Sequence, residues 1–159
     1  MHKIIDSFTG PFRFLSNFYP VDILYEGIHY PSTEHAFQAA KTTDEAARFT
    51  ISLCPTPGYA KRAGKRVVLR ENWDNLKYGI MHELVNKKFG EHRPDLRQKL
   101  LETGYAILIE GNTWGDETWG CTHSSKLHPT EWAGKNWLGK ILMDVRDDIV
   151  RSKMKETGE

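Results

Sequence analysis

The chain has 159 residues, of which 39% are hydrophobic and 11% aromatic, which is enough to bury one core but not a second. Its 22 basic and 21 acidic side chains leave a formal charge of +1, which excludes whole-molecule attraction to nucleic acid or acidic membranes. No apolar run approaches the ~20 residues of a membrane-spanning helix, and the segment from Met1 to Asp6 lacks the apolar stretch of a signal peptide. We therefore expect a single domain over residues 1–152 in the cytoplasm, with Cys54 and Cys121 as plain thiols.

Short strands are expected near the start of the chain. Residues 3–8 read as one strand, and residues 21–25 and 28–30 read as two more. The Glu-Gly pair between the last two segments suits the turn of a β-hairpin. Farther along, the unbroken apolar run at residues 105–109 indicates one central buried strand.

Helical patterns dominate the rest of the sequence. Ser32 is placed to cap a helix that ends near Lys41, and Thr43 or Asp44 to cap a second helix that ends before Pro55. Further helices are expected over residues 58–66, 73–89, 94–103 and from 138 to at least 149.

Two of these helices show an apolar face. In the helix over residues 73–89, the expected buried positions are Leu76, Ile80, Leu84, Val85 and Phe89. In the last helix they are Leu138, Ile141, Leu142, Val145 and Ile149. The polar residues 153–159 lack periodicity and are expected to be a frayed tail. The predicted fold class is therefore α+β, with helices dominant in one compact domain.

Several large enzyme classes have no support in the sequence. It contains no Walker-type phosphate loop, no G-x-S-x-G, no H-E-x-x-H and no paired C-x-x-C. Cys121, His123 and His128 form the nearest approach to a metal pattern, but no fourth ligand stands in an obvious position. We therefore predict no metal and no cofactor.

Two carboxylates stand out as candidates for acid–base chemistry. Glu34 lies near the start of a helix whose neighbouring residues are apolar, so it serves either as a capping carboxylate or as a catalytic group tuned by burial. Asp116 follows the expected buried strand in a turn-rich loop, and it equally suits an Asx-turn with Gly115. Cleavage of a glycosidic bond passes through an oxocarbenium-like state and requires one group to activate water and another to assist the leaving group. Glu34 and Asp116 are the predicted pair.

Other side chains suit the recognition of a nucleotide-like substrate, although each also suits the protein core. Aromatic rings that can stack on a base are Phe12, Phe14, Phe18, Tyr19, Trp73, Trp114 and Trp119. Amide side chains that can bind ribose hydroxyls or base edges are Asn17, Gln38 and Asn136. Basic residues that can clamp a phosphate, or simply keep a helix face solvated, are Lys61, Arg62, Lys65, Arg66 and Arg70.

Several motifs in this order resemble the NADAR superfamily of YbiA-like proteins, over nearly the whole chain. They are Phe14-Leu-Ser-Asn-Phe-Tyr-Pro20, Tyr30-Pro-Ser-Thr-Glu-His-Ala-Phe-Gln-Ala-Ala-Lys41, Ala60-Lys-Arg-Ala-Gly-Lys-Arg66, Leu69-Arg-Glu-Asn-Trp73, Asp116-Glu-Thr-Trp-Gly120 and Asn136-Trp-Leu-Gly-Lys-Ile-Leu-Met143. The resemblance implies an N-glycosidase that acts on ribosylamino-pyrimidine phosphates of early riboflavin biosynthesis or on ADP-ribose attached to guanine, free or in nucleic acid.

The resemblance also implies roles for individual residues. It places the family's catalytic positions on Glu34, Trp73 and Asp116. The substrate-binding residues then expected are Phe14, Asn17, Gln38, Lys41, Lys65, Arg70, Trp119 and Asn136. The segment 121–135 departs from the family pattern, because it is longer and lacks a glycine-rich run, so it is a candidate lid or substrate contact. The main rival interpretation is a module that binds ADP-ribose or a related nucleotide without hydrolysing it.

Overall fold

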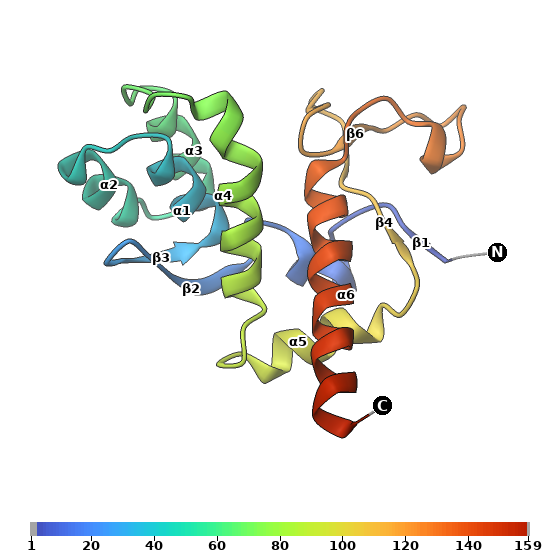
Figure 1. Ribbon diagram of the computed structural model, residues 1–159. Coiled ribbons are helices and arrows are strands. Elements are labelled where there is room, and N and C mark those ends of the chain that lie inside the picture. Colours follow the sequence, from blue (N-terminus) through green and yellow to red (C-terminus); the bar gives the residue numbers. More distant parts are fainter. Residues whose placement is uncertain (1–2, 159) are drawn as a thin grey trace. The chain divides into compact units, whose positions relative to one another are not determined.

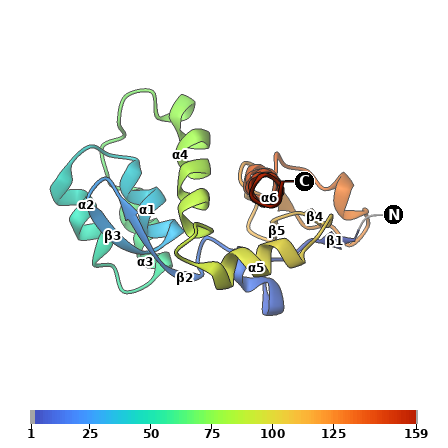
Figure 2. The ribbon, with the colours of Figure 1, turned by 60° about the horizontal axis from the view of Figure 1, so that its bottom comes forward.

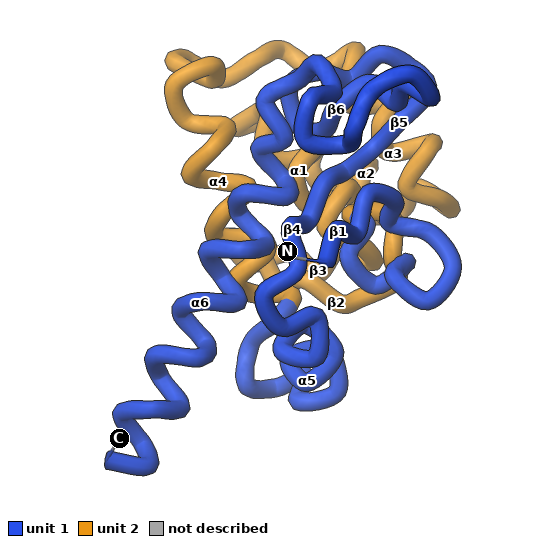
Figure 3. The backbone as a smooth tube through the Cα atoms, turned by 90° about the vertical axis from the view of Figure 1, so that its right-hand side faces the viewer, with its two compact units in different colours: residues 1–16, 89–159 blue, residues 17–88 orange. Residues whose placement is uncertain are grey.

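The structure is a computed structural model, and it describes residues 3–158. The described chain is α+β with helices dominant, as predicted (Figure 1). Backbone contacts group it into two compact units (Figure 3). Unit 1 comprises residues 1–16 and 89–159, and unit 2 comprises residues 17–88. The single-domain boundary at residues 1–152 stays a prediction.

Unit 2 begins with the predicted hairpin. Strands β2 (Pro20–Tyr25) and β3 (Ile28–Ser32) pair antiparallel, with Tyr25 opposite Ile28. Glu26 and Gly27 both have positive φ, at 46° and 88°. Positive φ at both central residues is typical of the two-residue turn whose twist matches the flanking strands, so the hairpin prediction is confirmed.

Helix α1 (Thr33–Ala40) forms the centre of unit 2, and all of its residues are buried. The Ser32 hydroxyl caps it by accepting from the His35 backbone N–H, as predicted. The hairpin and the other helices of the unit pack around α1 (Figure 1). These helices are α2 (Glu45–Ser52, capped by Asp44), α3 (Pro57–Gly64, capped by Thr56) and α4 (Trp73–Lys88).

The predicted buried face of α4 is wrong in part. Leu76 is 38% exposed and Ile80 is only partly buried, and the helix ends one residue before Phe89. The residues of α4 that are buried are Trp73, Met81, Leu84, Val85 and Lys88. The buried face of α4 therefore differs from the predicted one, because it includes Met81 and the aliphatic stem of Lys88. A pattern based on apolar residues does not predict that a lysine is buried.

Unit 1 contains a parallel strand pair and the last two α-helices. Strands β1 (Ile4–Ile5) and β4 (Ile107–Leu108) are each two residues long, so the strands predicted at residues 3–8 and 105–109 are too long. After β1 the chain turns into the 3-10 helix η1 (Gly10–Leu15), and Tyr105 before β4 is 87% exposed.

Helix α6 (Trp137–Thr157) contacts β4 and helix α5 (Pro94–Glu102), and Figure 2 looks almost along its axis. The five apolar positions predicted to be buried in α6 are buried. The helix continues through residues 153–157, which are exposed and which we predicted as part of a frayed tail. Residue 159 of that tail lies outside the described residues.

The segment that joins β4 to α6 contains elements that the sequence did not indicate. Strands β5 (Gly111–Asn112) and β6 (Cys121–Thr122) pair parallel, and a short 3-10 helix η2 (Pro129–Glu131) follows. Within the 121–135 segment, Trp132 packs with Ile109 and Cys121, and its indole N–H donates to backbone oxygens of the same segment. The segment is therefore folded around its own tryptophan.

Candidate active site

Helix α1 places Glu34, Gln38 and Lys41 on one face, because residues four and seven positions apart lie above one another. Glu34 is 8% exposed, and its Oε1 accepts a hydrogen bond of 2.8 Å from Gln38 Nε2. The Glu34 backbone N–H donates to the backbone oxygen of Asn17 at 3.0 Å. Three predicted site residues, Asn17, Glu34 and Gln38, therefore come together in unit 2.

Two amide oxygens beside Glu34 lack a hydrogen-bond donor. Asn17 Oδ1 and Gln38 Oε1 are buried, and neither accepts a hydrogen bond from the described part of the chain. The Gln38 amide orientation is fixed because its Nε2 donates to a carboxylate, which leaves Oε1 as the open acceptor. An unsatisfied buried acceptor costs about 1–3 kcal/mol, and Gln38 Oε1 carries this cost where it faces Gly64 of α3.

Helix α3 lies close against Gln38 because Gly64 has no side chain. A Cβ atom at Gly64 would lie 1.9 Å from Gln38 Oε1 and 2.8 Å from its Cδ. The glycine therefore sets the position of the amide that holds Glu34. The sequence motif contained this glycine, but nothing in the sequence indicated what it contacts.

Basic residues from three helices surround the end of α1. Burial lowers the pKa of Lys41, and the nearby Glu34 carboxylate raises it. The ammonium groups of Lys61, Lys65 and Lys77 lower the pKa of Lys41 further, so these four lysines share one neighbourhood. Lys77 of α4 is a member that the linear basic cluster did not reveal.

Arg70 reaches the same end of α1 through its backbone. Its N–H donates to the Lys41 backbone oxygen at 2.7 Å. The substrate-binding roles of Lys41, Lys65 and Arg70 stay predictions, but the positive charge that a phosphate needs lies beside Glu34.

Trp73 is the first residue of α4, and it packs on α1. Its ring centroid lies 5.2 Å from that of Phe37, which is three residues after Glu34 on α1. The side chain is 7% exposed. This burial fits a core residue, and the proximity to the α1 face fits a residue that positions substrate.

Unit 1 contains the second predicted carboxylate. Asp116 is partly buried, and its Oδ1 accepts from the backbone N–H groups of Thr118 and Trp119, both at 3.0 Å. Its other oxygen, Oδ2, accepts no hydrogen bond from the described residues. The loop therefore orients the carboxylate by one oxygen and leaves the second oxygen available for chemistry.

Asn112 holds the same loop from the preceding strand, and sequence reasoning missed it. Its Oδ1 accepts from the N–H groups of Gly115 and Asp116, and its Nδ2 donates to the Asp116 backbone oxygen at 2.8 Å. The Asx-turn considered for Asp116 is present, because its Oδ1 accepts from the N–H two residues on, but the turn runs to Thr118 and not through Gly115. Asn112 instead accepts from N–H groups three and four residues on. The sequence did contain a signal for this role, because an asparagine just after a buried strand is typical of a residue that organises the following turn.

The other predicted residues of unit 1 make contacts inside that unit. The amide of Asn136 accepts from the Glu110 N–H and donates to the Leu108 oxygen, and it thereby ties the start of α6 to β4. Phe14 is buried and lies edge-on to Phe89. The Trp119 ring is partly buried and packs edge-on against Trp137, with centroids 5.5 Å apart. Their roles in substrate binding stay predictions.

Two histidines make contacts inside the protein. His35 of α1 bonds the Ser32 hydroxyl and the Cys54 backbone oxygen, and the His123 ring packs on Trp132. Within residues 3–158, no group of three or more His, Cys, Asp or Glu side chains is placed to hold a metal ion. No helix in the same range is long and apolar enough to cross a membrane.

Comparisons with known proteins give one consistent result. The model of the NADAR domain family matches residues 6–150. An N-glycosidase from Nostoc punctiforme is 38% identical over 153 residues, which cover 93% of this chain and 92% of that protein. A riboflavin biosynthesis protein from Vibrio vulnificus is 33% identical over 86% of this chain and 35% of its own length. The NMR structure of Escherichia coli YbiA superimposes with a TM-score of 0.80 at 33% identity, covering 97% of this chain and 89% of that one.

Proposed function

The chain belongs to the NADAR domain family, and from this premise we propose that it hydrolyses the N-glycosidic bond between a phosphorylated ribose and a nitrogenous base. The relatives from Nostoc punctiforme and Escherichia coli are named N-glycosidases, and they match most of this chain. The enzyme class is therefore hydrolase acting on N-glycosyl compounds.

The observation that carries the proposal is the surroundings of Glu34. Its buried carboxylate is held by Gln38, and a group of lysines lies nearby. The lysines suit a phosphate, and the carboxylate suits the positive charge that develops on the sugar. These are the parts of a substrate in which a base leaves a phosphorylated ribose.

The reaction requires balanced changes at one carbon. A water oxygen bonds to the anomeric carbon while the bond from that carbon to the base nitrogen breaks. One proton leaves the water, and the base nitrogen takes up one. We assign these two proton transfers to Glu34 and Asp116 together, with Trp73 positioning the substrate and no metal or cofactor.

Two substrate classes fit this chemistry. One is the ribosylamino-pyrimidine phosphates of riboflavin biosynthesis, which the name of the Vibrio vulnificus relative supports. The other is ADP-ribose attached to guanine, as a free nucleotide or within nucleic acid. Both carry a ribose phosphate that would lie near Lys41, Lys65 and Arg70. The proposed setting is the cytoplasm.

The test is to incubate the purified protein with each substrate class and to follow release of the base by chromatography. We expect release from at least one class, and no release by a Glu34→Gln variant of unchanged circular dichroism. Tight binding of both substrates without release by the wild-type protein would instead identify a nucleotide-binding module.

A further inference from the structure

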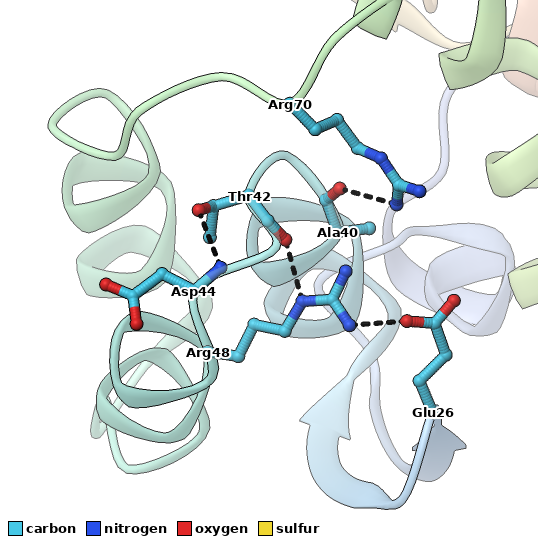
Figure 4. A network of polar contacts seen from close by, with 6 residues as sticks. All are labelled: Glu26, Ala40, Thr42, Asp44, Arg48 and Arg70. Carbon is cyan, nitrogen blue, oxygen red and sulfur yellow. Dashed lines mark hydrogen bonds and ion pairs between the residues drawn. The ribbon is translucent and has the colours of Figure 1, made fainter.

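Unit 2 contains a pocket of about 600 Å³ that includes none of the predicted catalytic residues. A volume of this size lies within the range of small-molecule sites. The hairpin turn, the start of α2 and the segment before α4 form it (Figure 4). Its lining residues are Glu26, Gly27, Ile28, Thr43, Glu45, Arg48, Phe49 and Arg70.

Arg48 is built into this pocket as a fixed cation. It is 6% exposed, and its guanidinium lies 5.5 Å from the centre of the Tyr25 ring. Its Nε donates to the Thr42 backbone oxygen at 2.7 Å, and its Nη1 pairs with the Glu26 carboxylate. That pairing lowers the pKa of Glu26, so the two charges offset each other. Nη2 then remains as a donor at the pocket wall.

Arg70 supplies a second guanidinium, which hydrogen-bonds the Tyr25 side chain and whose charge helps to lower the pKa of Glu26. Its Nη1 makes a long hydrogen bond of 3.4 Å to the Ala40 backbone oxygen. Within residues 3–158, it has no carboxylate at ion-pair distance. Figure 4 shows the guanidinium groups of Arg70 and Arg48 directed toward the same space beside Ala40. Two such forks match the oxygens of a phosphate or carboxylate.

Phe49 adds an aromatic surface at the same pocket. It follows Arg48 on α2. Its side chain is 57% exposed, whereas most phenylalanines are largely buried. An exposed phenyl ring gives a planar ligand a face on which to stack. The Glu45 carboxylate, also in the lining, can accept hydrogen bonds from an amino group.

We propose that this pocket binds an aromatic anion of nucleotide size, with its phosphate on Arg70 and Arg48 and its ring on Phe49. The pocket lining excludes Glu34, Gln38 and Trp73 but includes Arg70, which the proposed function also assigns to the substrate phosphate, so AMP binding by a Glu34→Gln variant is needed to distinguish the two sites. The proposal assigns a second ligand site to unit 2, in which Arg70 lies between the pocket and the end of α1.

The test is a calorimetric titration of the full chain with AMP, with adenosine and with inorganic phosphate. We expect AMP to bind at least tenfold more tightly than either fragment, because only AMP engages both the arginines and Phe49. Phe49→Ala should weaken AMP binding at least about fivefold, the lower end for loss of one stacked base. Arg70→Gln should weaken AMP and phosphate while leaving adenosine unchanged.

Two matched controls locate the binding. Leu53→Ala removes another exposed apolar side chain, 66% exposed, just beyond α2 and outside the pocket, so it should leave AMP binding unchanged. Glu34→Gln should also bind AMP normally. The proposal fails if AMP does not bind at millimolar concentration, if Phe49→Ala binds it as tightly as wild type, or if Glu34→Gln abolishes binding.

Discussion

Glu34 and Asp116 are both carboxylates held by hydrogen bonds, but their donors differ. Glu34 accepts from the Gln38 side chain inside a buried helix, whereas Asp116 accepts from two backbone N–H groups in a loop. In both residues an amide side chain can replace the carboxylate and keep the hydrogen-bond acceptor. Each role can therefore be tested without removing the contact that holds the residue.

We predict that Glu34→Gln and Asp116→Asn each lower turnover at least ~100-fold, because a positioned acid or base is removed. The unfolding midpoint should change little, since the substituted amides retain an oxygen acceptor. Single-turnover assays and urea titrations measure the two effects. Asp116→Ala is the structural control, because it also removes the acceptor for Thr118 and Trp119 and should lose about 1 kcal/mol of stability. Near-normal turnover in both amide variants would rule out the two-carboxylate mechanism.

Trp73→Phe separates positioning from packing. The ring is 7% exposed against Phe37, so a smaller ring should lower the melting temperature by a few degrees. If Trp73 also positions the substrate, turnover per folded molecule should fall on the order of 100-fold. Differential scanning fluorimetry and an active-site-normalised rate measure each effect. A lower melting temperature with unchanged turnover would make Trp73 a core residue only.

At the scale of elements, features that depend on neighbouring residues were predicted from the sequence, whereas pairing between distant segments was not. The hairpin turn at Glu26-Gly27 and the Ser32 cap depend on neighbouring residues, and both were predicted correctly. Strands β5 and β6 are two residues each and pair across a loop, so no periodicity marks them. The position of Gln38 under Gly64 also depends on tertiary packing, which a motif does not describe.

Gly64→Ala tests whether close packing of α3 positions the active-site amide. Alanine favours a helix by about 1 kcal/mol over glycine, but here its Cβ would displace the Gln38 side chain. We predict a loss of turnover of at least about tenfold with no gain in stability. Gly79→Ala in α4 is the matched control, because a Cβ there meets nothing within 4 Å, and it should stabilise the protein with full activity. Equal gains in stability from both substitutions would contradict the proposed role of Gly64.

Helix α1 should also make stability depend on pH through His35. Burial lowers the pKa of His35 below its ordinary 6.5. The hydrogen bond to the Cys54 backbone oxygen raises this pKa and so offsets part of the effect of burial. Below pH 6.5, His35 is protonated in the unfolded chain but stays neutral in the folded chain. This contribution to stability is therefore fully present above pH 6.5 and is lost as the pH is lowered below it. We expect the wild-type protein to lose more unfolding free energy between pH 7.5 and 5.5 than His35→Gln does, as measured by urea titration. Identical losses would show that His35 titrates freely in the folded protein.

At the scale of the whole molecule, the near-neutral composition means that any phosphate must be recognised by a local group of basic residues. The formal charge of +1 gives no long-range attraction to an anion, yet four lysines gather near Glu34. The sequence predicted part of this group, because Lys61 and Lys65 are neighbours in the chain. The family resemblance also placed Lys41 among the expected substrate-binding residues, whereas Lys77 was not predicted, because it joins the group only when α1 and α4 pack together.

The last prediction follows from this local concentration of charge. A phosphate bound by lysine and arginine makes binding weaken as salt is added, whereas a near-neutral protein without such a site shows little salt dependence. Wild-type KM should therefore rise between 50 and about 300 mM salt, while kcat stays nearly constant, because these groups bind the ground state and the transition state alike. The double variant Lys65→Ala, Arg70→Ala should start from a higher KM, and that KM should rise less with salt. A matched double variant, Lys153→Ala, Lys155→Ala, removes the same charge from the exposed end of α6 and should keep the wild-type salt response. If both double variants respond to salt alike, the basic residues near α1 are only a solvated surface.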